Sequence, residues 1–246
     1  MPTFAVILPA AGKSSRFRDK FYKKPFFPLE NRPLWLHAAE KFTSRQDVRQ
    51  TILVIASEDR EQFELKFGGN AALLGVQVVV GGQERYDSVA AALAQVQADV
   101  EYVAVHDAAR PCLADEWIDA VFAAAVQSGA AILATPVVGT LKRVGPNQEI
   151  QSTVSRDALW EAQTPQVFRR QLLAEAYARR EGAAVTDDAQ LVERLGHKVT
   201  VVLGSPMNLK VTTKDDLRLA GAILKALPRP KLGSAANPFA DDHLWK

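Results

Sequence analysis

Short apolar runs recur along the chain and alternate with longer segments of helical spacing. The runs are continuously aliphatic rather than alternating with polar residues, which is typical of strands covered on both faces. They lie at 4–8, 51–55, 76–80, 102–105, 131–135 and 199–203, and the helical segments at about 34–42, 59–67, 87–97, 115–127, 170–181, 187–195 and 214–227. Strand alternating with helix predicts an α/β fold with a mostly parallel, doubly wound sheet.

Length and charge bound the possible functions. At 246 residues with 48% hydrophobic residues, the chain can bury a full core, and one large domain is expected because α/β proteins often run this long as a unit. The formal net charge of +2 is too small for a general binder of nucleic acid or of a membrane surface. If the protein binds an anionic ligand, the Lys and Arg residues that contact it must therefore be gathered at the binding site itself.

The amino-terminal and uncharged segments point away from export and membrane insertion. No basic region precedes the first apolar run and Pro9 interrupts it, so we expect no signal peptide and a cytoplasmic protein. Residues 120–141 carry no charge over a length that could span a bilayer, but Gln127-Ser128-Gly129 marks a turn in the middle. The single cysteine, Cys112, excludes an internal disulfide and any multi-cysteine metal site.

Residues 140–155 interrupt the strand and helix alternation. Two short strand-like stretches flank a Gly145-Pro146-Asn147 turn, which predicts a β-hairpin arm at about 138–156. Exposed hairpin edges need cover, most simply from a second subunit, although a hairpin folded against its own domain would also cover them. From residue 228 onward the sequence is rich in Pro, Gly and Ala, so we expect a domain at 1–227 and a flexible tail at 228–246.

The loop after the first predicted strand is small-residue-rich and then basic. Pro9-Ala10-Ala11-Gly12 is followed by six basic residues between positions 13 and 24, opposed by Asp19 alone. A turn that lets backbone amides approach a ligand, followed by Lys and Arg, suits a polyphosphate. The loop is neither a Walker motif nor a dinucleotide fingerprint, which argues against an ATPase or a dehydrogenase. A solvated basic loop is the alternative.

Two further loops follow predicted strands, where open parallel sheets bind ligands. Gly81-Gly82-Gln83-Glu84-Arg85 precedes Ser88 at a helix start, a pattern that suits close ligand approach or only a turn. In the other loop, Asp107 could hold Mg²⁺ or a ribose hydroxyl and Arg110 a phosphate, unless the two pair with each other. His106 is expected to pack or hydrogen-bond, because no nucleophile stands near it in sequence.

Polar and positively charged residues later in the sequence would complete the site. Thr140 and Arg156 bracket the hairpin, Thr164 follows it, and Lys210 lies just beyond the last predicted strand. With the first loop they would supply the positive charge that phosphoryl or nucleotidyl transfer requires, since its transition state carries dispersed negative charge.

Taken together, the motifs resemble one enzyme family. They are Pro9-Ala10-Ala11-Gly12, Gly81-Gly82-x-Glu84-Arg85-x-Asp87-Ser88-Val89, Val105-His106-Asp107-Ala108-Ala109-Arg110-Pro111, Thr164-Pro165-Gln166, Thr186-Asp187-Asp188 and Asn208-x-Lys210-Val211-Thr212. In order and spacing from about Thr3 to Leu227, the set resembles the 2-C-methyl-D-erythritol 4-phosphate cytidylyltransferases of the non-mevalonate isoprenoid pathway.

The resemblance implies a Rossmann-like nucleotidyltransferase fold that dimerises through the hairpin arm. It also implies a reaction of CTP with methylerythritol phosphate, with Mg²⁺ on the triphosphate and Asp107 near the ribose and metal. The cations implied for catalysis are Arg16 and Lys24 at the α-phosphate and Arg156 and Lys210 at the attacking phosphate. The contacts implied for cytosine and ribose come from Ala10, Ala11, Gly12, Gly82, Gln83 and Ser88, and those for the sugar phosphate from Arg110, Thr140 and Thr164.

The chain departs from the family pattern in the first loop. Ser14 stands where glycine is usual, Lys24-Pro25 replaces a Lys-Gln pair, and one extra residue separates Arg16 from Lys24, so Lys23 could stand in for Lys24. Ser205-Pro206-Met207 occupies a place where the family often has an acidic residue. The alternatives are a cytidylyltransferase for another polyol phosphate, such as ribitol 5-phosphate, and a catalytically dead nucleotide-binding scaffold.

Overall fold

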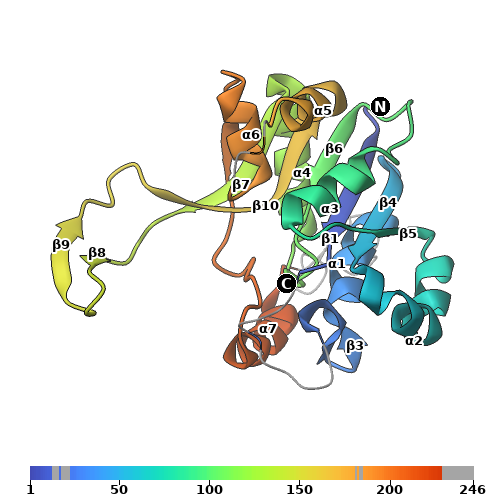
Figure 1. Cartoon of the computed structure of the whole chain (residues 1–246), viewed down its shortest axis with the longest axis horizontal. Helices are drawn as coiled ribbons and strands as arrows, with labels where there is room; N and C mark the ends of the chain where they lie inside the picture. Colours follow the sequence, from blue (N-terminus) through green and yellow to red (C-terminus); the bar gives the residue numbers. More distant parts are fainter. Residues whose placement is uncertain (13–16, 18–22, 181, 183–184, 229–246) are drawn as a thin grey trace, which may run out of the picture.

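The structure of the chain, a computed structural model, describes residues 1–12, 17, 23–180, 182 and 185–228 (Figure 1). Within them, one sheet of seven strands runs in the order β11-β7-β10-β6-β1-β4-β5. Its strands are β1 (Phe4–Pro9), β4 (Val48–Ile55), β5 (Val76–Val80), β6 (Tyr102–Val105), β7 (Ala130–Pro136), β10 (Trp160–Arg169) and β11 (Thr200–Leu203). All six strands predicted from the sequence are present, and the mixed α/β fold with a mostly parallel sheet is confirmed.

β10 is the strand that the sequence pattern did not predict. It lies between β6 and β7 and runs antiparallel to both, whereas the β1–β4, β1–β6, β4–β5 and β7–β11 pairs are parallel. Pro165 lies inside it, and proline normally argues against an interior strand. The register of β10 on β7 shifts between Ala162 and Gln166, so the missing amide of Pro165 falls where the ladder is already interrupted.

Helices cover both faces of the sheet (Figure 1). One core joins the sheet to α1 (Leu34–Thr43), α2 (Arg60–Leu73) and α4 (Asp115–Ser128), and the other joins it to α3 (Arg85–Leu93), α5 (Arg170–Ala178) and α6 (Asp188–Arg194). β1 serves both cores, since Val6 and Leu8 pack on the first side and Ile7 on the second. Successive strand residues point to opposite faces, so an apolar run without alternation is what two covered faces require.

Two helices differ most from their predicted bounds, and the others agree within three residues at each end. α2 continues past the predicted end at residue 67, through Gly68 and Gly69, because Ala71 beyond them is buried in the core. The helix predicted at 87–97 is α3, which begins two residues earlier at Arg85. Its start is held by a capping box in which Glu84 and Asp87 each accept a hydrogen bond from the other's backbone amide.

The predicted hairpin is present as β8 (Leu141–Val144) and β9 (Ile150–Val154), paired antiparallel as a separate sheet. It extends away from the body of the molecule (Figure 1), so it is not folded against its own domain. Val138, Val144 and Ile150 on this arm are exposed apolar side chains.

The carboxyl-terminal helix of the domain packs in a third hydrophobic cluster. α7 (Lys214–Ala226) packs in a third cluster with Phe17, Leu29 of β2 (Pro28–Leu29) and Val211, close to the β3 strand (Arg32–Pro33) that pairs with β2. The expected tail lies, apart from Pro228, outside the described residues. Within the described residues, no helix has both the length and the apolar character needed to cross a bilayer.

Candidate active site

Two adjoining cavities share three charged residues, Arg85, Asp107 and Lys210. The first cavity has a volume of about 310 Å³ and is lined by Pro9, Ala10, Ala11, Gly12, Lys24, Pro25, Gly82, Gln83, Glu84, Arg85, Ser88, Asp107, Ala109 and Lys210. The second has about 220 Å³ and is lined by Arg85, Asp107, Arg110, Ala162, Gln163, Thr164, Gln166, Thr186, Asp187 and Lys210. Loops after β1, β5 and β6 meet here because the carboxyl ends of parallel strands lie at one edge of the sheet.

Most of the residues singled out from the sequence line one of these cavities. The first cavity gathers Ala10, Ala11, Gly12, Lys24, Gly82, Gln83, Ser88, Asp107 and Lys210, and the second gathers Arg110 and Thr164. Arg16 lies outside the described residues. Thr140 and Arg156 are both exposed on the arm and line neither cavity of their own chain, and Arg156 donates a hydrogen bond to the Val138 carbonyl.

Glycines shape the wall of the first cavity in two ways. A Cβ added to Gly81 would come within 2.8 Å of Val54 Cγ1 and would also overlap Ser88, and one added to Gly82 would overlap Asp87. These two glycines therefore let the loop after β5 pack against α3. Among the described residues, no atom lies within 4 Å of a Cβ added to Gly12, which lines the first cavity.

Asp107 is the electrostatic centre of the site. Its carboxylate lies 2.7 Å from Lys210 Nζ, 3.6 Å from Arg110 Nε and 3.7 Å from Arg85 Nε. Burial alone would raise the pKa of Asp107, but these three cations lower it well below its usual range. The pairing of Asp107 with Arg110 considered from the sequence is thus real, and it is one of three such contacts.

Arg85 has a more central place in the site than its sequence motif predicted. It lines both cavities and reaches across to α6, where its Nη2 donates to Asp188 Oδ2 at 2.7 Å, and the Tyr177 hydroxyl donates to the other oxygen of Asp188. Burial alone would lower the pKa of Arg85, but Asp188 and Asp107 raise it overall. The sequence showed both motifs, Glu84-Arg85 and Asp187-Asp188, without showing that they meet.

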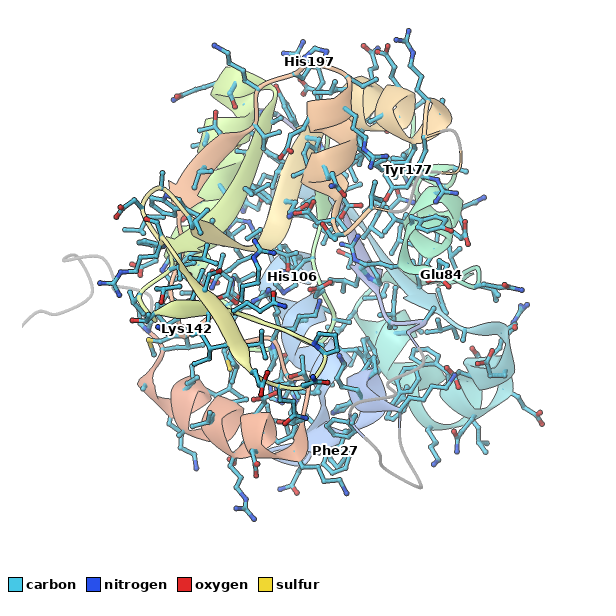
Figure 2. All side chains as sticks on the ribbon, turned by 60° about the vertical axis from the view of Figure 1, so that its left-hand side comes forward. Phe27, Glu84, His106, Lys142, Tyr177 and His197 are labelled. Atoms are coloured by element: carbon cyan, nitrogen blue, oxygen red, sulfur yellow. The ribbon has the colours of Figure 1, made fainter. Side chains whose placement is uncertain are left out.

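A buried hydrogen-bond network holds the loop after β6. His106, near the middle of the body in Figure 2, faces the Arg110 carbonyl through Nε2 at 3.1 Å and the Thr164 hydroxyl through Nδ1 at 3.2 Å. Burial lowers the pKa of His106 to about 4. The neutral ring therefore donates from Nε2 and accepts at Nδ1, which confirms the hydrogen-bonding role expected for it. The Arg110 guanidinium donates to the Asn208 carbonyl at 2.7 Å.

The structure separates the two adjacent lysines of the first loop. Lys24 lines the first cavity. The Lys23 ammonium instead lies 2.7 Å from Glu58 Oε1 and 2.8 Å from Asp59 Oδ2, at the start of α2. The placement therefore favours Lys24 over Lys23 as the cation facing a ligand.

The site offers little to hold a metal by itself. Among the described residues, no group of three or more His, Cys, Asp or Glu side chains is arranged to hold an ion. Asp107 contributes one carboxylate to the cavity wall, already surrounded by cations. This donor set fits a Mg²⁺ that arrives with phosphate oxygens as its main ligands, which is the usual way in which proteins hold this ion.

Comparison with known proteins points to one enzyme family. The family model for 2-C-methyl-D-erythritol 4-phosphate cytidylyltransferase (IspD) matches residues 4–226. Proteins of that name from Rhodopirellula baltica and Bacillus pumilus are 44% and 40% identical, over 89% and 91% of this chain and 94% and 97% of theirs. The crystal structure of the Thermus thermophilus protein of that name aligns with a TM-score of 0.74 at 34% identity, covering 92% of this chain and 100% of that one. Because the match spans nearly the whole described domain and both cavities, this chain belongs to the 2-C-methyl-D-erythritol 4-phosphate cytidylyltransferase family.

Proposed function

We propose that this enzyme transfers CMP from CTP to 2-C-methyl-D-erythritol 4-phosphate, giving 4-diphosphocytidyl-2-C-methyl-D-erythritol and pyrophosphate in isoprenoid precursor biosynthesis. The observation that carries the proposal is the family match over residues 4–226. The two cavities support it, since they adjoin at Asp107 and Lys210 as a nucleotide site and an acceptor site must.

The chemistry explains why the site is built from cations. A phosphate oxygen of the acceptor attacks the α-phosphorus of CTP, and the bond from that phosphorus to the bridging oxygen breaks to release pyrophosphate. The attacking phosphate is already ionised, so no protein base has to remove a proton. The obstacle is repulsion between anions, and catalysis is mainly positioning and charge stabilisation.

The first cavity is assigned to CTP. Ala10, Ala11, Gly82, Gln83 and Ser88 would hold the cytosine, and Gly12 and Asp107 would lie near the ribose and the metal. The buried Ser88 supports this assignment, because its hydroxyl is held by the Glu84 carbonyl at 3.2 Å on the cavity wall. Small residues there leave room for a base and expose backbone groups that can hydrogen-bond to it.

The charged residues divide between the two reacting phosphates. Lys24, with Arg16, would stabilise the α-phosphate, and Lys210 would orient the attacking phosphate. Arg110 and Thr164 would bind the sugar phosphate from the second cavity. Lys210 is well placed for a shared role, because it lines both cavities and contacts Asp107 at 2.7 Å.

The acceptor site is proposed to be completed by a second subunit. Arg156 and Thr140 line neither cavity of their own chain, yet the arm that bears them carries exposed apolar side chains that a partner would cover. In a two-fold homodimer, each arm would bring these residues to the opposite acceptor cavity.

Mg²⁺ would neutralise part of the triphosphate charge, with Asp107 as the nearest protein ligand. The chain's own cations would act on the remaining charge. The cytoplasmic location expected from the amino-terminal sequence stays a prediction.

Substrate choice tests the proposed function. Pyrophosphate release is measured for each of the four nucleoside triphosphates against a panel of sugar and polyol phosphates, with Mg²⁺ present. CTP with methylerythritol phosphate should exceed every other pair. Faster turnover with ribitol 5-phosphate would favour a different polyol phosphate, and no turnover with any pair would favour a nucleotide-binding scaffold.

A further inference from the structure

Lys23 stands next to a cavity residue but is held by a different part of the molecule. Its ammonium lies between Glu58 Oε1 at 2.7 Å and Asp59 Oδ2 at 2.8 Å. Asp59 is the residue that precedes α2, and its carboxylate is largely buried. The next residue along the chain, Lys24, lines the first cavity. The ion pair therefore fixes the backbone directly beside a proposed catalytic cation.

The helix that follows Glu58 and Asp59, α2, holds the other side of Lys24. Phe26 is buried and packs against Phe63 and Phe67 of α2, with ring centroids 5.8 Å and 5.9 Å apart. A short 3₁₀ turn, Lys24–Phe26, links the aromatic contact to the ion pair. Lys24 thus lies between an ionic contact with the 3₁₀ turn Ser57–Asp59, which leads directly into α2, and an aromatic contact with α2 itself.

We propose that Lys23 is a positioning residue for nucleotidyl transfer, and that its ion pair with Glu58 and Asp59 holds Lys24 at the wall of the CTP cavity. This inference rests on the proposed function. A lysine has a flexible four-carbon stem, so its ammonium stabilises a transition state well only where the backbone beneath it is fixed. The pairing also keeps the Lys23 charge away from the phosphates.

The electrostatics of Lys23 agree with this role. Burial alone would lower the pKa of Lys23, but its ionic contacts with Asp59 and Glu58 raise it overall, so the ammonium stays charged at neutral pH. The Lys23–Glu58 contact is partly exposed, with side chains 26% and 65% exposed, and such pairs add little to folding stability. The Asp59 carboxylate is largely buried, so Lys23→Met also leaves a buried charge unpaired and should lower the melting temperature. Neutralising both carboxylates avoids that cost and should change turnover more than the melting temperature.

The test compares variants on the two sides of the ion pair. Lys23→Met keeps the apolar stem and removes the charge, and Glu58→Gln/Asp59→Asn removes both carboxylate charges while leaving Lys23 intact. Each should lower kcat about tenfold with KM for the acceptor nearly unchanged, in assays run well below the Tm of every variant. Tm should stay within about 2 °C in Glu58→Gln/Asp59→Asn, which leaves no buried carboxylate unpaired. Lys23→Arg should retain most of the activity. Lys41→Met is the matched control, because Lys41 is similarly exposed and pairs with Asp115 away from both cavities.

A second comparison separates positioning from direct contact with the phosphates. In a Lys24→Ala background, adding Lys23→Met should cause no further loss of kcat, because the residue that Lys23 positions is already gone. A further loss in that background would overturn the proposal. So would full activity of Glu58→Gln/Asp59→Asn beside a crippled Lys23→Met, since that result would place Lys23 itself on the phosphates.

The outcome is independent of the acceptor's identity. Wild-type turnover of CTP with methylerythritol phosphate is measured first, and its failure would reject the proposed function. If another acceptor proved better, the same variants would be compared with that acceptor. Equal kcat for wild type and Lys23→Met would then reject the positioning role alone.

Discussion

At the scale of single residues, the charged cluster shared by the two cavities holds more positive than negative charge. Arg85, Arg110 and Lys210 surround Asp107, and Asp188 balances Arg85 from the far side. In this cluster three cations face two carboxylates, and both carboxylates are buried. Such fixed charge is preorganised for an anionic substrate and needs no rearrangement as the transition state forms.

Lys24 should contribute to the transition state more than to binding. Lys24→Ala is expected to lower kcat on the order of a hundredfold, the usual cost of removing one preorganised donor, with a smaller change in KM for CTP. Steady-state pyrophosphate release measures both constants. Arg16→Ala should behave in the same way, and Lys198→Ala, which removes an exposed lysine outside both cavities, serves as the control. A mild Lys24→Ala effect would remove Lys24 from the proposed catalytic set.

His106 should make the folded state sensitive to acid. Its pKa falls from 6.5 to about 4 on folding, so between these values the unfolded chain binds the proton that the folded chain excludes. The free energy of unfolding should therefore rise with pH across this window, by up to about 3 kcal/mol from this group. Urea unfolding at several pH values measures the slope, which should be smaller in His106→Gln.

The pKa of His106 can also be measured directly in the wild-type protein, which tests the prediction even if His106→Gln folds poorly. The imidazole signals of the wild-type protein, followed by NMR, should show no titration of His106 down to about pH 5. Titration near 6.5 would show that the ring is not held neutral by its burial. Titration of Asp107 does not contribute to the slope between the two pKa values of His106, because the pKa of Asp107 lies well below that range.

At the scale of elements, the arm is the part whose role its own chain does not explain. β8 and β9 pair only with each other among the described strands, and they project from the body that holds both cavities (Figure 1). Lys142, on β8, is an exposed residue of this arm, labelled in Figure 2. An exposed arm with apolar side chains fits an interface between two copies of the chain.

Mixing experiments should show whether the arm serves the opposite subunit. Arg16→Ala and Arg156→Ala chains are each expected to be inactive, and co-refolding them should make about half of the dimers mixed. With shared sites, one cavity of each mixed dimer collects both lesions and the other collects neither. Roughly a quarter of all sites should then regain full activity in the pyrophosphate assay.

Two controls make the mixing result specific. Mixing Arg16→Ala with Lys24→Ala should restore nothing, because both lesions belong to the same chain's cavity and every site keeps one of them. Arg143→Ala, an exposed substitution on the same arm, should stay active. If the Arg16→Ala and Arg156→Ala mixture stays as inactive as its parents, Arg156 serves its own subunit and the shared site is rejected.

At the scale of the whole molecule, the family match and the described domain end at nearly the same place. The match stops at residue 226, where α7 ends, and Leu227 packs against the third core cluster. The sequence beyond it is rich in Pro, Gly and Ala. The described residues that line the two cavities all lie between positions 9 and 210.

Removing the tail should leave the enzyme intact. A chain that ends at Leu227 is expected to keep its Tm within about 2 °C and its kcat within about twofold, because the deleted residues lack the apolar content of a core segment. Thermal unfolding and the pyrophosphate assay check this. A large fall in Tm would show that Phe239 or Trp245 docks on the body.

The sequence by itself determined six of the seven strands of the main sheet, the approximate positions of the helices, and the loops that carry the chemistry. Continuous apolar runs are a local signal, so β1, β4 and β6 could be predicted without knowledge of their neighbours. The loops after them could then be placed at one edge of the sheet, which brought Gly12 and Asp107 to one cavity.

The tertiary structure decided which distant residues meet. Arg85 and Asp188 are 103 residues apart and pair only because α3 and α6 pack on the same face of the sheet. β10 takes its place through pairing with β6 and β7, which outweighs the local signal of Pro165. Lys23 and Lys24 are chemically alike, and only the position of Asp59 separates their roles. The physical reason is that ion pairs and strand order depend on long-range packing, whereas periodicity records only which side of an element is buried.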